Sequence, residues 1–198
     1  MLDFLRVKTV PTVSWSSPRP LNFFPALRTF VLLCIGLVLF GVGEALLINA
    51  GVGVSPWTVF SQGVANTSGL GIGMSTFFIG VGVLVLWIPL RQTPGLGTLL
   101  NIIIIAAVME LSLPYLPQMA GTVSGIIQTM LGVFIVGLGS GLYLVAHLGP
   151  GPRDGVMTGF HRVTGLPVGL VRVIIEGTVG GLGEVRYTHR TRRAEREG

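Results

Sequence analysis

Apolar residues occur in long runs along this chain, and connections rich in glycine, proline or charged residues separate the runs. The first run, residues 29–50, is 22 residues long, and about 20 apolar residues let a helix cross a bilayer. It exceeds a signal-peptide core of about 7 to 15 residues and lacks a clean cleavage site, so we expect it to be retained. The pattern predicts an all-α, polytopic membrane helix bundle with about five hydrophobic segments: residues 29–50, 72–90, 99–113, 123–148 and 166–183.

Two shorter segments of helical character, residues 56–65 and 156–164, lie between these runs and follow glycine- and proline-rich turns. At 1.5 Å per residue, the first would form a helix of roughly 15 Å, about half the hydrocarbon thickness. We therefore predict two short broken or re-entrant helices.

The chain also resembles itself. The first match pairs Gly51, Gly53 and Thr58 with Gly149, Gly151 and Val156 at an offset of 98, and the second pairs Gly69 with Gly165 and Gly73 with Gly169 at an offset of 96. Three crossings separate the two units, so the sequence predicts an inverted repeat. Inverted repeats with paired broken helices are typical of secondary transporters, and chance alignment of glycine-rich membrane segments is the alternative.

Composition excludes an ordinary soluble domain. Charged residues make up 11% of the chain, against about 25% in soluble domains, and the mean hydropathy is +0.77. The formal net charge of +5 does not indicate nucleic-acid binding, because the basic residues lie at the two ends and in short connections. The positive-inside rule then predicts a cytoplasmic N-terminus.

We divide the chain into a polar N-terminal tail, residues 1–28, a membrane domain, residues 29–183, and a basic tail, residues 184–198. Four prolines in the first tail predict poor order, and we expect the second tail to be disordered. A crossing segment at 166–183 would export the arginines of the second tail, which conflicts with the charge rule.

Ionisable residues at membrane depth are functional candidates, because only a partner or a wet cavity offsets their desolvation. Glu44 lies well inside the first run without a partner on its own helix, and it is the strongest single candidate. Glu110 lies toward the end of the third run. Arg172 and Glu176 share a helix face at i, i+4 spacing, and mutual neutralisation is an equally supported interpretation of that pair.

The motif GPGPRDG places two further charges, Arg153 and Asp154, at the second short helix, where they would cap the helix or face a substrate. Four polar residues also lie in apolar surroundings, and hydrogen bonding between helices explains such residues more often than transport does. They are Asn49, Asn101, Gln128 and His147.

We expect no enzyme activity, no cofactor and no metal site. Ser140 and His147 would share a helix face but lie about 10 Å apart along the axis, which is beyond hydrogen-bond reach. Cys34 is the single cysteine. The sequence contains no HExxH spacing, and its many GxG pairs follow no predicted strand, so a nucleotide site is unsupported.

The turns GVGVSPWTV, PGLGTLLN, GLYLVAHLGPGPRDG and LVRVIIEG resemble the YczE-like branch of the YczE/YyaS/YitT group of bacterial integral membrane proteins over about residues 29–180. The resemblance implies a multi-span protein of the bacterial inner membrane, with no defined biochemical activity. The motif positions are Ser55, Pro56, Trp57, Gly149, Pro152, Arg153, Asp154, Gly155, Arg172 and Glu176.

The chain departs from this pattern after Gly183, where relatives continue with hydrophobic sequence and this chain becomes strongly basic. A truncation or reading-frame shift would explain the departure, and the second unit would then lack its final helix.

Two functional hypotheses follow, both with the lipid bilayer as the surrounding partner. The first is a small-solute or ion permease with its site at the broken helices, using Glu44, Arg153, Asp154, Arg172 and Glu176. Secondary candidates are Asn49, Ser55, Trp57, Asn101, Glu110 and His147. The second is a non-transporting membrane scaffold or regulator, in which the same charges hold helices together.

Overall fold

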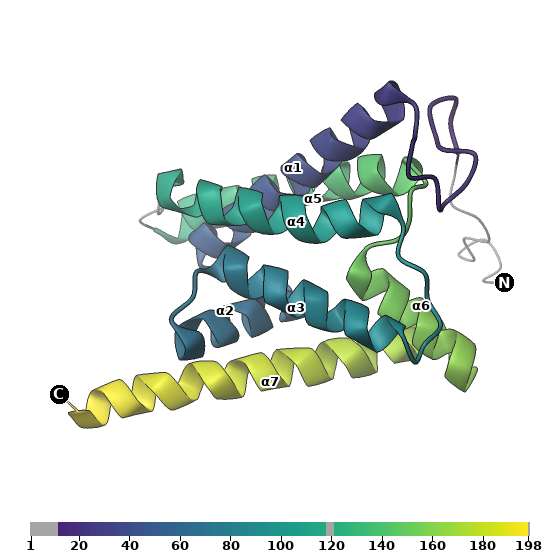
Figure 1. The fold of residues 1–198 in the computed structure, drawn as a ribbon. Helices are drawn as coiled ribbons and strands as arrows, with labels where there is room; N and C mark the ends of the chain where they lie inside the picture. Colours follow the sequence, from purple (N-terminus) through teal and green to yellow (C-terminus); the bar gives the residue numbers. More distant parts are fainter. Residues whose placement is uncertain (1–11, 118–120, 198) are drawn as a thin grey trace, which may run out of the picture.

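The computed structural model describes residues 12–117 and 121–197, and their regular structure is helical throughout, which confirms the predicted all-α class. Figure 1 shows the arrangement of the helices. They are α1 (Leu27–Ala50), α2 (Pro56–Ser68), α3 (Ile72–Trp87), α4 (Leu96–Ser112), the 3₁₀ helix η2 (Leu113–Tyr115), α5 (Thr122–Val145), α6 (Pro152–Thr164) and α7 (Val168–Glu197).

Three helical stretches in the described part of the chain are long and apolar enough to cross a membrane: α1, α4 continued by η2, and α5. Helices α2 and α3 qualify only as a pair, bent by 112° at the break between them. The count is therefore three or four rather than the predicted five. Helix α3 has 16 residues and spans roughly 24 Å, short of the roughly 30 Å of hydrocarbon. The predicted fifth segment corresponds to the start of α7, which is not among these candidates.

Large apolar side chains cover the outside of the bundle. On α5, Met130, Val133 and Phe134 are 68%, 58% and 64% exposed. A water-soluble protein rarely exposes so much contiguous apolar surface, whereas a lipid-facing helix requires it. The helix surfaces therefore agree with a multi-pass membrane protein.

The element order α1–α2–α3 recurs as α5–α6–α7, as the internal repeat predicts. Helices α1 and α5 both have 24 residues, and α2 and α6 both have 13. The two short helices end at Gly69 and Gly165, which lie 96 positions apart and adopt left-handed φ angles of 77° and 69°. In Figure 1, α1 and α5 run in opposite directions, and so do α3 and α7. The second unit is thus inverted relative to the first.

Glycines let α1 and α5 approach closely. A methyl group on Gly36 would lie 2.9 Å from Gly139 O, and one on Gly132 would lie 3.1 Å from Gly43 O. Gly36 corresponds to Gly132 in the second unit, and Gly43 corresponds to Gly139, each at the repeat offset of 96. The contact between Gly36 and Gly139 is therefore the symmetry equivalent of the contact between Gly132 and Gly43. The crossing therefore lies on the axis that relates the repeats, and small residues are what such close helix crossings require.

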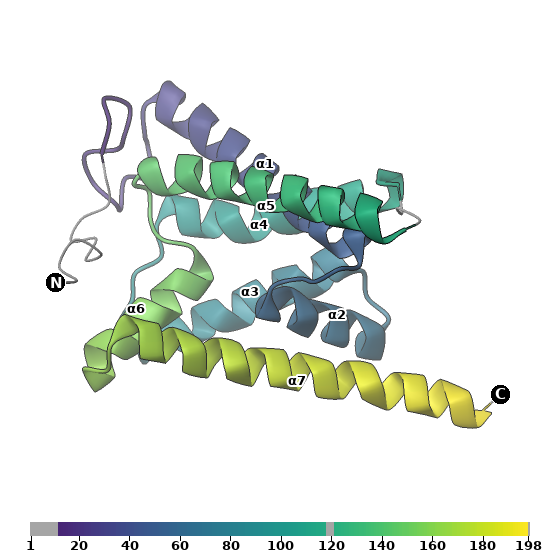
Figure 2. The ribbon, with the colours of Figure 1, turned by 180° about the vertical axis from the view of Figure 1, so that it is seen from behind.

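Around this crossing, helices of one unit also pack against helices of the other. Helix α2 packs against α7, and α6 packs against α3, as the view from behind shows (Figure 2). At the second contact, Trp87 Nε1 donates a 3.0 Å hydrogen bond to Pro152 O, and Gly155 leaves space for the Trp87 ring.

Helix α4 joins the two units at both of its ends. At its start, Gly97 N donates to Leu148 O (2.8 Å) and Thr98 Oγ1 donates to Pro150 O (2.7 Å), which fixes the turn that leads into α6. At its end, Glu110 Oε2 accepts the backbone N–H groups of Gly73 (2.8 Å) and Met74 (3.2 Å) in the first turn of α3.

Glu110→Ala should lower the free energy of unfolding by about 1 to 2 kcal/mol, because two N–H groups at a helix start lose their charged acceptor. Thermal unfolding of the detergent-solubilised chain measures this loss. Glu110→Gln keeps one oxygen acceptor and should recover most of it. Equal melting temperatures for the Ala variant, the Gln variant and the wild type would contradict the capping role.

The predicted N-terminal tail is partly ordered. Ser17 is 3% exposed and its N–H donates to Ala146 O (3.0 Å), while the Ser16 hydroxyl donates to Val145 O (2.6 Å). Residues 12–26 thus satisfy carbonyls that the end of α5 leaves free. Residues 1–11 lie outside the described part. At the other end, α7 continues to Glu197, where we predicted a disordered tail, and the Arg, Glu and Ala residues there favour helix.

Candidate functional site

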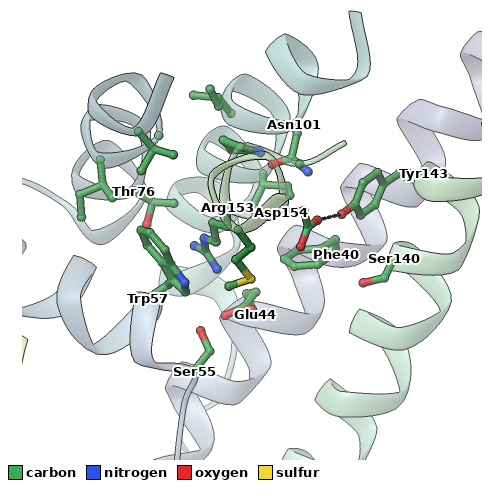
Figure 3. A pocket seen from close by; sticks show the side chains of 18 of the residues that line it. Phe40, Glu44, Ser55, Trp57, Thr76, Asn101, Ser140, Tyr143, Arg153 and Asp154 are labelled. Carbon is green, nitrogen blue, oxygen red and sulfur yellow. Dashed lines mark hydrogen bonds between the residues drawn. The ribbon is translucent and has the colours of Figure 1, made fainter. Parts of the chain in front are cut away.

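A cavity of about 310 Å³ lies between the two units, and all five principal candidates from the sequence line it. Figure 3 shows this cavity from close by. Among the sequence candidates, its lining comprises Glu44, Arg153, Asp154, Arg172 and Glu176 with the secondary candidates Ser55, Trp57 and Asn101. Residues far apart in the sequence meet here because the N-terminal turns of α2 and α6 both open onto the cavity.

The lining follows the repeat. Six pairs of lining residues lie 96 positions apart: Glu44 and Ser140, Ser55 and Gly151, Pro56 and Pro152, Trp57 and Arg153, Thr76 and Arg172, and Gly80 and Glu176. The cavity therefore lies on the axis that relates the two units. In each pair that contains a charged residue, the equivalent position is uncharged, so the backbone is symmetric but the charge is not.

Glu44 projects from α1 toward the start of α2. It is 5% exposed, and its Oε2 accepts a 2.8 Å hydrogen bond from Thr58 Oγ1. Thr58 in turn donates its backbone N–H to Ser55 Oγ (3.3 Å), so Ser55 is the N-cap of α2. The predicted partner across the bundle is therefore a threonine hydroxyl at a helix start, where the dipole favours a carboxylate.

Arg153 extends from the first turn of α6 over the indole of Trp57, with its Cζ 5.3 Å from the ring centroid. In the part of the chain that the structure describes, its guanidinium has no carboxylate within ion-pair distance. An arginine side chain stays protonated in proteins, so Arg153 brings a positive charge to the cavity. Trp57 is 6% exposed, and its Nε1 has no hydrogen-bond partner among the described residues.

Asp154 follows in the same turn and accepts a 3.0 Å hydrogen bond from the Tyr143 hydroxyl. Helix α6 begins at Pro152 rather than at the predicted Val156, with Gly151 as its N-cap. Asp154 is thus inside the first turn instead of capping the helix. Its charge still faces the positive end of the helix dipole.

Arg172 and Glu176 lie on α7 at the rim of the cavity. Arg172 Nε lies 2.9 Å from Glu176 Oε1, and the two side chains are 65% and 28% exposed. The predicted i, i+4 pair is present. The two charges neutralise each other at an exposed position, so this ion pair contributes little to the free energy of unfolding.

Three secondary candidates lie outside the cavity. Asn49 donates to Leu116 O (2.8 Å), Glu110 caps α3, and His147 Nδ1 contacts Ser17 O at 3.0 Å. Each connects separate segments of the chain. The cavity also contains residues that we did not predict, including Tyr143 and Thr76. The repeat offset would have identified Thr76 from Arg172 and Ser140 from Glu44.

No group of three or more histidine, cysteine, aspartate or glutamate side chains within the described ranges could hold a metal ion. The cavity is lined instead by five charged side chains of mixed sign, an indole, amide and hydroxyl groups, and aliphatic side chains. Such a lining, between spanning and broken helices, defines a multi-pass helical membrane protein with a cavity that carries both polar and apolar side chains.

The chain belongs to a family of unknown function, DUF6198, which matches residues 27–183. An uncharacterized protein of Haemophilus influenzae is 37% identical over 192 residues, covering 92% of this chain and 87% of that protein. The uncharacterized membrane protein YczE of Bacillus subtilis is 34% identical over 148 residues, covering 73% and 68%. The resemblance to YczE is thus confirmed as homology. No solved structure matches.

Proposed function

We propose that this protein is a small-solute or ion permease of the bacterial inner membrane, with its binding site in the cavity between α2 and α6. The observation that carries the proposal is the pair of N-terminal turns, Ser55–Trp57 and Gly151–Arg153, which line one cavity from two inverted units. Broken helices at a repeat axis are the usual place for a transporter site.

Energetics support the same proposal. Glu44, Arg153 and Asp154 would be costly inside a bilayer without a wet cavity or mutual compensation, and none of them forms an ion pair with another charged residue in the described segments. Inverted units supply two equivalent hinges, so the cavity can open toward either face by similar movements. The positive-inside pattern of the connections favours a cytoplasmic N-terminus.

Accessibility from both sides of the membrane tests the permease without a known substrate. In a Cys34→Ser background, Ser140→Cys places a single thiol in the cavity. We expect a membrane-impermeant thiol reagent to label it in right-side-out and in inside-out vesicles, because alternating access exposes the site to each face in turn.

Gly141→Cys is the matched control, one residue farther along α5, where nothing lies within 4 Å. A thiol facing lipid should react from neither side. The scaffold alternative predicts labelling of Ser140→Cys from one face at most, and that result would refute the permease.

A further inference from the structure

Two hydrogen-bond donors at the cavity have no acceptor among the described residues. They are Trp57 Nε1, on a side chain that is 6% exposed, and the guanidinium of Arg153. In Figure 3 both groups lie on the same side of the cavity, near Glu44. They come from equivalent positions in the first turns of α2 and α6, whose dipoles add positive potential. This side of the cavity is therefore complementary to a carboxylate.

A free acceptor lies beside these donors. One oxygen of Glu44 accepts the Thr58 hydroxyl, and no described residue donates a hydrogen bond to the other. Glu44 is 5% exposed, and a buried carboxylate needs a compensating charge or further donors. An ammonium group would supply both.

Charge balance selects between the ligand classes. The lining carries three carboxylates, of Glu44, Asp154 and Glu176, and two guanidinium groups, of Arg153 and Arg172. Arg172 pairs with Glu176, so the lining as a whole has one negative charge in excess. A simple anion would add to the negative excess, and a simple cation would leave Trp57 and Arg153 without an acceptor. A zwitterion leaves the net charge of the cavity unchanged. Its carboxylate supplies an acceptor for Trp57 and Arg153, and its ammonium group supplies a donor for Glu44.

The remainder of the cavity is apolar, and its aliphatic side chains come mainly from α3 and α4. They are Ile79, Val83, Ile102, Ile105 and Leu144. A cavity of about 310 Å³ is at the small end of ligand sites in proteins. An aliphatic group of a few carbons fits this wall better than a polar or bulky one.

We propose that the cavity binds a small aliphatic amino acid, with its carboxylate on Arg153 and Trp57 and its ammonium group on Glu44. This inference rests on the proposed permease function and names the substrate class of the same site.

Titration calorimetry of the detergent-solubilised full chain with three matched probes tests it. The probes are leucine, isocaproate, which lacks the ammonium group, and isoamylamine, which lacks the carboxylate. Leucine should bind at least about tenfold more tightly than either analogue, because each analogue leaves a buried polar group without a partner.

Two substitutions test the carboxylate contact. Trp57→Phe keeps a ring under Arg153 but removes the indole N–H, and it should weaken leucine binding about tenfold. Because Trp57 packs in a core cluster with Val83 and Trp87, the smaller ring should also lower the melting temperature, so binding is measured well below it. Arg153→Gln should weaken binding about a hundredfold or more. Arg162→Gln is the matched control, because it makes the same change at an exposed position of α6 and should leave binding unaltered.

The outcomes separate this inference from the permease itself. Equal affinity for isocaproate would overturn the ammonium contact, and equal affinity for isoamylamine would overturn the carboxylate contact. If no probe binds while the Ser140→Cys protein is labelled from both faces, the substrate class is wrong and the permease stands. If leucine binds while labelling occurs from one face only, the amino-acid site stands and transport fails.

Discussion

Gly155→Ala is expected to lower the free energy of unfolding by about 3 kcal/mol, the upper part of the range for overpacking a core. An added methyl group at Gly155 would overlap the Trp87 ring, which is 1% exposed and held by its hydrogen bond to Pro152 O. The ring cannot move without separating α6 from α3. We also expect leucine binding to be lost, because α6 carries Arg153 into the cavity.

Thermal unfolding of the detergent-solubilised chain measures this effect, with Gly137→Ala as control. Gly137 has nothing within 4 Å, so its substitution should be neutral or slightly stabilising, since alanine favours helix over glycine. In a Trp87→Leu background, Gly155→Ala should cost much less, because the contact is already removed. If Gly155→Ala lowered the free energy of unfolding by the same amount in that background, the Trp87 contact would not be the cause of the loss.

Gly139→Ala is expected to have a similar or larger effect, through the crossing of α1 and α5. Its methyl group would lie 2.6 Å from both Gly36 O and Phe40 N. Both are backbone atoms of a packed helix, so no rotamer change relieves the overlap. We expect a loss of about 3 kcal/mol or more, measured by thermal unfolding.

The repeat provides a matched comparison. Gly43, the equivalent of Gly139, would place its methyl group 2.7 Å from Val136 Cγ2 and 2.9 Å from Val136 N. Because a side chain takes part of this overlap, Gly43→Ala should destabilise less than Gly139→Ala. Gly141→Ala, which meets nothing within 4 Å, should be tolerated. Equal effects of Gly139→Ala and Gly141→Ala would contradict the close crossing.

Local signals in the sequence were enough to predict most helices. Pro56 and Gly69 bracket α2, and Pro152 and Gly165 bracket α6, since proline favours a first turn and glycine adopts the left-handed C-cap. The start of α6 was misplaced at Val156, because GPGPR reads as a turn although Pro152 already begins the helix. Segment lengths were overestimated where apolar residues continue past a helix end, as at 88–90.

The site was only partly predictable. Glu44 and Glu110 are both single acids in apolar helices, and nothing local distinguishes them. In the fold, one lines the cavity and the other caps α3. The repeat offset of 96 relates Trp57 to Arg153 and Glu44 to Ser140, so it identifies cavity residues that no local signal distinguishes.

By itself, the sequence determined the membrane environment, the order of the helices and the inverted repeat. These depend on hydrophobic length, on charge and on turn residues, all of which act over a few neighbours. Only the tertiary structure decided which polar residues share one cavity. That outcome depends on which face of each helix its neighbours cover, and the close crossing at Gly36 and Gly139 sets those faces.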